Sequence, residues 1–111
     1  MYQDNTVLCG SSAYERKFYL NENFASLPSQ IKDELKIMCV LFTEEVGGVL
    51  TLVFDEDGTL TLNVATDEGD ILFDEIGAAL KIKQIQMEKQ ELFEALESYY
   101  KVFILGEEID E

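Results

Sequence analysis

Carboxylates are the side chains whose number and spacing in this sequence could do chemistry. The 111 residues include 23 Asp and Glu against 8 Lys and Arg, a formal net charge of −15, and no histidine. Ten of the acids fall between Lys36 and Lys81, a stretch that contains no basic residue. Clustered carboxylates can dock a basic protein, bind a divalent cation, or serve as acid and base in catalysis.

A predicted hairpin decides where these acids lie. Residues 49–54 and 59–64 alternate apolar and polar side chains around Asp55-Glu56-Asp57-Gly58, which predicts two antiparallel strands and a tight turn. The entry to the first strand and the exit from the second then meet at one end of the sheet. We expect seven carboxylates to crowd that end, and we call them the acidic rim: Glu44, Glu45, Asp67, Glu68, Asp70, Asp74 and Glu75.

The acidic rim admits several interpretations. The plainest is a solvated surface in which Asp70 caps a helix and its neighbours suit the positive end of the helix dipole. The leading functional interpretation is a docking surface for a basic protein partner. A third is a Mg²⁺ or Ca²⁺ site built on Asp70 and Asp74, one helical turn apart. A DNA-mimicking inhibitor, with carboxylates along an elongated face, is a further alternative.

Familiar catalytic motifs are missing from the sequence. Without histidine there can be no Ser-His or Cys-His nucleophile and no histidine metal site. A calcium loop with Gly58 at its sixth position would start at Val53 and end at Val64, and neither side chain can ligate. Gly47-Gly48 lacks the Lys-Ser/Thr of a phosphate loop. The sequence favours a non-enzymatic protein without cofactor, metal ligand or catalytic residue, with a metal-dependent carboxylate enzyme as the alternative.

The N-terminal half predicts two strands and a helix. Residues 14–20 read as a strand, preceded by a short strand at 6–9 and a turn at Gly10-Ser11-Ser12. Ser26 is the expected N-cap of a short helix that reaches Lys36. Residues 37–43 are apolar on every side, which fits a buried helix end or a central strand. Their β-branched and aromatic content and the following glycines favour a strand.

The C-terminal third has the period of a helix. Two rows of apolar residues recur from residue 71 onward: Ile71, Ala78, Ile85, Leu92 and Tyr99, with Ile82, Leu96 and Phe103 as companions. An unbroken helix from Asp70 to Gly106 would have about 35 residues and a length of about 50 Å. Because that overhangs a small domain, we expect part of the stripe to form a homodimer, although Lys89 excludes a long regular coiled coil. The alternative is a break near Ser98 with a final strand at 100–105.

Together these elements predict an α+β fold. We expect one domain over residues 1–111, with a mostly antiparallel sheet of about four strands, one short helix and a long C-terminal helix. Residues 107–111 should be a frayed acidic tail, and Cys9 and Cys39 should be reduced, buried thiols.

The charge and the hydropathy pattern limit which partners and which cellular location we expect for this chain. The chain's charge argues against binding to nucleic acid or anionic membranes, since both require clustered bases. The sequence shows no signal peptide and no apolar stretch that could span a bilayer, which predicts a cytoplasmic protein.

Two segments carry a resemblance to a known family. Residues 37–48 (IMCVLFTEEVGG) and 73–77 (FDEIG) resemble a family of short, acidic proteins of unknown function from Firmicutes. The resemblance spans most of the chain and implies a bacterial cytoplasmic protein. It implies no activity and no site residues.

Overall fold

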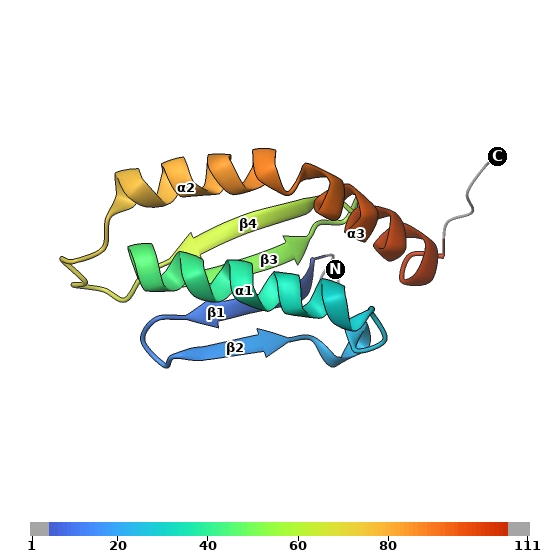
Figure 1. The fold of residues 1–111 in the computed structure, drawn as a ribbon, viewed down its shortest axis with the longest axis horizontal. Coiled ribbons are helices and arrows are strands. Elements are labelled where there is room, and N and C mark those ends of the chain that lie inside the picture. The colour runs from blue at the N-terminus through green and yellow to red at the C-terminus, as the bar shows by residue number, and fades with distance from the viewer. Residues whose placement is uncertain (1–4, 107–111) are drawn as a thin grey trace.

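The protein is an antiparallel sheet with helices packed on it, as seen in a computed structural model that describes residues 5–106 (Figure 1). The strands are β1 (Thr6–Ser12), β2 (Lys17–Leu20), β3 (Val49–Phe54) and β4 (Leu60–Ala65), in the order β2-β1-β3-β4. The helices are η1 (Glu22–Phe24), α1 (Ser29–Val46), α2 (Glu75–Glu88) and α3 (Gln90–Phe103). All strand pairs are antiparallel. The predicted α+β class and four-stranded antiparallel sheet are confirmed.

The β3–β4 hairpin matches its prediction closely. Leu52 pairs with Leu62 and Phe54 with Leu60, and the side chains of Leu52 and Phe54 are fully buried. In the turn, Asp55 Oδ1 accepts hydrogen bonds from the backbone N–H groups of Asp57 and Thr59, at 2.8 and 3.0 Å. The alternation therefore reflects one face against the core, and the turn has a structural role.

The first two strands differ from the prediction. Residues 10–12, predicted to form a turn, lie inside β1, and the turn instead occupies residues 13–16. Gly10 is required there by the close approach of β3, because a Cβ at this position would lie 2.6 Å from the carbonyl oxygen of Leu50. Glycine in this strand signals tight backbone packing and not a reversal.

Residues 37–43 are helical, so the prediction of a strand is wrong. Helix α1 has 18 residues and ends at Val46, so it is longer than the short helix predicted to reach Lys36. Met38 and Phe42 are buried in the core, whereas Ile37 and Leu41 remain about half exposed. The segment looks apolar on every side because one side faces the core while the other borders a groove toward α2. Tertiary packing overrides the strand propensity of this run.

The start of α1 also differs. The residue at the N-cap is Pro28, which makes no side-chain cap, and the helix begins at Ser29. Ser26, predicted as the cap, instead forms a hydroxyl–hydroxyl hydrogen bond of 3.1 Å with Tyr99 of α3.

The predicted long C-terminal helix is divided into two. The break is at Lys89, whose φ of −109° and ψ of 22° separate α2 from α3. The Lys89 ammonium forms an ion pair of 2.9 Å with Glu34 of α1, which anchors the break against the rest of the fold. Because α3 continues to Phe103, neither the break at Ser98 nor the final strand is present. Most of both apolar rows nevertheless joins the core cluster.

The two cysteines are free and buried, as predicted. Cys9 Sγ of β1 lies 3.9 Å from Cys39 Sγ of α1. The hydrogen bond between the thiols, together with burial, raises the pKa of Cys9 far above its ordinary value. A thiol held protonated in this way is a poor nucleophile.

Two predictions concern the membrane and the tail. Within residues 5–106, no helix combines the length and the apolarity that crossing a bilayer requires. The acidic tail predicted at 107–111 lies outside the described residues.

Candidate functional site

The sheet register brings four chain segments together at one end of the molecule. Ser12 pairs with Val49, and Val49 pairs with Ala65, so the β1–β2 turn, the entry to β3 and the exit from β4 are neighbours. Helix α1 ends there, because only Gly47-Gly48 separates it from β3, and the loop 66–74 leads from there into α2 (Figure 1).

Both runs of rim acids lie at this end. Gly48 contacts Phe73 closely enough that a Cβ on Gly48 would lie 3.0 Å from the Phe73 ring, so the segment after Glu45 meets the segment before Asp74. Six of the seven rim carboxylates are on exposed residues, and Asp70 is half-buried. The geometry that the hairpin implied is present. Whether a partner binds here stays a prediction.

Tyr14 ties the β1–β2 turn to the loop. Its hydroxyl donates a hydrogen bond of 2.5 Å to Asp70 Oδ2 and accepts one of 3.0 Å from the backbone N–H of Asp67. The bond to the Asp70 carboxylate raises the pKa of Tyr14 above its ordinary value, although the Asp67 N–H acts in the opposite direction. Asp70 Oδ1 also accepts from the N–H of Leu72, which completes a turn inside the loop. Asp70 therefore organises the loop and does not cap a helix.

Asp74 is the cap that was expected of Asp70. Its Oδ1 accepts a 2.9 Å hydrogen bond from the N–H of Gly77, and helix α2 begins at the next residue, Glu75. The cap satisfies one of the unpaired N–H groups of the first turn, and the charge of Glu75 suits the positive end of the helix dipole. These two rim residues stabilise α2 whatever else they do.

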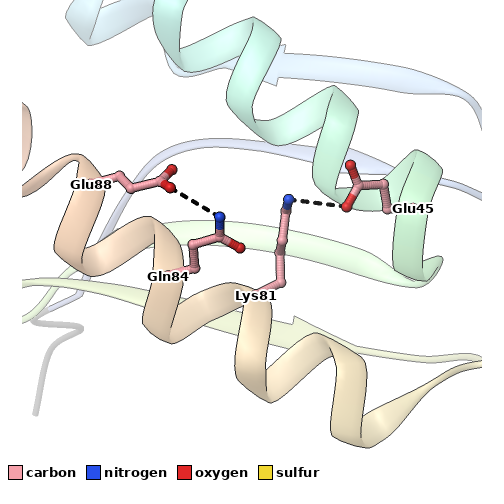
Figure 2. A network of polar contacts seen from close by, with 4 residues as sticks. All are labelled: Glu45, Lys81, Gln84 and Glu88. Carbon is pink, nitrogen blue, oxygen red and sulfur yellow. Dashed lines mark hydrogen bonds and ion pairs between the residues drawn. The ribbon is translucent and has the colours of Figure 1, made fainter.

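Glu45 already has a partner within the chain. Figure 2 shows Lys81 of α2 reaching across to the end of α1, where its ammonium lies 3.0 Å from Glu45 Oε1. One α-helical turn further along α2, Gln84 Nε2 donates to Glu88 Oε2 at 2.9 Å. Lys81, which ends the stretch without basic residues, therefore pairs with an acid of that same stretch. The sequence alone did not reveal this ion pair.

Two aliphatic side chains stand out beside the carboxylates. Ile71 is 91% exposed and Leu72 is 90% exposed, in the loop between Asp70 and Asp74. The prediction counted Ile71 as the first member of a buried helical row, which is wrong because the helix starts later. On α2, Ile76 and Leu80 are exposed apolar side chains as well. The exposure of Ile71 and Leu72 could have been predicted only by knowing that α2 begins at Glu75.

The carboxylates of the acidic rim are not arranged to bind a metal ion. Among residues 5–106 there is no group of three or more Asp, Glu or Cys side chains placed to hold one. The proposed pair is occupied otherwise, since Asp70 binds Tyr14 and Leu72 while Asp74 caps α2. A Mg²⁺ or Ca²⁺ ion needs several oxygen ligands converging on one point. The donor set does not fit such an ion.

Comparison with known proteins gives a family and no activity. Neither the curated proteins nor the solved structures contain a significant match to the chain. A family model does match, over residues 5–108, nearly the whole chain. The chain therefore belongs to DUF6145, a family of unknown function.

Proposed function

We propose that the protein is a non-enzymatic interaction module whose acidic rim docks a basic segment of a partner protein. The observation that carries the proposal is the exposure of Ile71 and Leu72 between carboxylates on both sides. Protein interfaces combine an apolar centre with a polar surround. Ile71 and Leu72, two exposed aliphatic side chains in a charged loop, match this arrangement. The partner segment would carry Lys or Arg around one or two apolar residues.

The apolar and charged parts contribute differently. Burying Ile71 and Leu72 in a partner would contribute about 2 kcal/mol each. Exposed carboxylates contribute little net affinity, but they steer a cationic segment toward the site and disfavour acidic competitors. Their effect is screened beyond about 8 Å at physiological salt, so it depends on the acids nearest the contact.

The loop is held in position before any partner arrives. Tyr14 holds it through Asp67 and Asp70, and the ring of Phe73 packs against Gly48. A surface fixed in this way loses less conformational entropy on binding than a free loop would. The tethers support a binding role for the exposed side chains between them.

A second copy of the chain is the main competing occupant. The homodimer expected through the C-terminal helices would use the outer side of α2, where Ile76 and Leu80 are 76% and 64% exposed. The charge argues for a basic partner instead, because two copies would bring the same carboxylates face to face. The resemblance to short acidic Firmicutes proteins supports the bacterial cytoplasm as the setting.

The test is affinity capture at physiological salt with matched charge reversals. Glu68→Lys with Glu75→Lys changes two exposed rim acids that the structure, within residues 5–106, leaves without a side-chain hydrogen bond or ion pair. The control, Glu56→Lys with Asp57→Lys, makes the same change of charge in the β3–β4 turn at the other end. We expect the rim pair to weaken binding of the captured partner at least about tenfold and the control pair to leave it within about twofold.

Further outcomes separate the alternatives. Ile71→Ser with Leu72→Ser should also abolish capture without lowering thermal stability. Equal binding by the rim and control variants would refute the acidic rim. If duplex DNA displaces the captured protein, the DNA-mimic interpretation replaces ours. If the wild type is a dimer that Ile71→Ser with Leu72→Ser makes monomeric, the occupant is a second copy.

A further inference from the structure

A cavity with basic walls lies beside the acidic rim, between α1 and the β1–β2 turn. Its volume is about 750 Å³. Arg16, Lys17 and Phe18 line it from the turn and β2, and Lys36, Val40 and Glu44 line it from α1. Three of the chain's eight basic residues, including its one arginine, therefore border a single cavity in a protein whose net charge is −15.

The fold brings these cations together from distant parts of the sequence. On α1, Lys36, Val40 and Glu44 follow one another at four-residue spacing and so share a helix face. Strand β2 is the short edge strand of the sheet, and Lys17 begins it. Arg16 closes the preceding turn with its N–H bonded to the carbonyl of Ser12 at 2.8 Å.

Arg16 sits in an unfavourable backbone conformation. Its φ of 56° makes it, among residues 5–106, the one residue other than glycine in the left-handed region. Glycine would occupy this position at a lower energy. Such strain at a charged residue beside a cavity is the pattern of a functional position, where the side chain matters more than the local backbone energy.

The three cations are not neutralised inside the described chain. The ion pairs within residues 5–106 use Lys81 and Lys89, and neither involves the cavity. Glu44 is the one carboxylate among the wall residues, so the wall carries a formal charge of +2. Arginine offers paired N–H donors that match phosphate oxygens, and lysine adds compact positive charge.

We propose that this cavity binds a small molecule bearing a phosphate monoester. A phosphate monoester carries about −1.5 to −2 charges at neutral pH, which matches the wall charge. The volume lies in the range of small-molecule sites, so it accommodates the phosphate together with a small organic group. Carboxylates more than about 8 Å from the wall weaken the attraction little, because salt screens charges beyond that distance.

The test is an NMR titration of the isotope-labelled full chain with inorganic phosphate as the probe. Saturable shifts should appear in residues 12–18 and 36–44. Arg16→Gly and Lys36→Gln should each weaken binding at least about fivefold, whereas Lys83→Gln, an exposed lysine of α2, should leave it unchanged. Glu44→Gln should strengthen binding about twofold or more, because it removes the opposing charge from the wall.

The melting temperature of Arg16→Gly distinguishes loss of phosphate binding from loss of folding. Arg16→Gly relieves the left-handed strain, so its melting temperature should not fall even though the phosphate site is lost. Shifts that do not saturate, or that survive Arg16→Gly and Lys36→Gln, would overturn the proposal. Succinate binding as tightly as phosphate would overturn the phosphate class. The rim is tested through Glu68 and Glu75, so the two proposals fail independently.

Discussion

At one end of the sheet the rings of Phe54 and Tyr100 stack with their centroids 4.2 Å apart, whereas at the other end Ile71 and Leu72 are almost bare. The first end is closed by aromatic rings, since Phe24 also stacks on Phe54 at 5.7 Å. The second end is closed by the two hydrogen bonds of a tyrosine hydroxyl, one donated and one accepted, and by glycine contacts.

The difference separates stability from recognition. Burial of aromatic side chains stabilises the folded state, and the large side chains at the aromatic end are buried in this way. The acidic end leaves comparable apolar atoms exposed and surrounds them with charge, so its side chains remain available to another molecule. Surface loops positioned by a rigid scaffold are where proteins commonly bind.

The strongest challenge to this comparison is removal of a ring from the aromatic end. Phe54→Ala should destabilise the protein by about 3–5 kcal/mol, because Phe54 is fully buried and its removal leaves a cavity. Leu72→Ala, at the acidic end, should change stability by no more than about 0.5 kcal/mol. Urea unfolding measures both. Similar losses from the two variants would show that the ends do not differ in this way.

A second test compares two glycines at the acidic end. Gly48 and Gly69 both have positive φ, 74° and 87°, so alanine costs each about 1–2 kcal/mol. A Cβ on Gly48 would also lie 2.9 Å from the carbonyl oxygen of Ala65, whereas a Cβ on Gly69 would meet nothing within 4 Å. Gly48→Ala should therefore lose about 1–3 kcal/mol more than Gly69→Ala in urea unfolding. Equal losses would mean that the packing of Ala65 and Phe73 against Gly48 is loose.

A third test asks whether the aromatic end also depends on hydrogen bonding. The Tyr100 hydroxyl and Thr6 Oγ1 are 2.8 Å apart and part-buried. Tyr100→Phe keeps the ring stacking and should lose about 1 kcal/mol, the usual contribution of one such bond. In a double-mutant cycle with Thr6→Val, the second substitution should add little once the hydroxyl is gone. Additive losses would assign the effect to something other than this bond.

The parts of the fold that were predictable are those governed by neighbouring residues. Alternation around Asp57-Gly58 predicts the hairpin, and the hairpin places the two runs of acids at one end. Residues 37–43 were mispredicted because local composition does not show that α2 would lie beside α1. Lys89 interrupts the apolar row in sequence, yet the break there depends on contacts such as the ion pair with Glu34.

The candidate site was predictable only in part, for a similar reason. The carboxylates follow from the strand order, but Tyr14 reaches the site through a turn that the sequence predicts three residues too early. Gly10 produced that error, since a glycine required by strand contact resembles one required by a turn. The exposure of Ile71 depends on where α2 begins, which Asp74 determines by capping it.

The smallest expected effect concerns the hydroxyl that holds the acidic end together. The ordinary pKa of a tyrosine is 10.0, and the bond to Asp70 raises the pKa of Tyr14 above it. A folded-state pKa above the unfolded one means that the bond stabilises the protein below about pH 10 and that this contribution is lost as the pH rises through the higher value. Phenolate absorbance should show one tyrosine fewer ionising above pH 10 in Tyr14→Phe than in the wild type.

The same variant distinguishes a local tether from a global one. Because the bond is exposed, Tyr14→Phe should leave the urea midpoint at neutral pH nearly unchanged, while amide exchange at Asp67 becomes faster as its N–H loses its acceptor. A Tyr14 that ionises at or below pH 10 would mean that Asp70 does not hold it. The exposed side chains of loop 66–74 would then be held by Phe73 and by the bond from the Asp67 N–H, and pre-organisation of the docking surface would lose one of its supports.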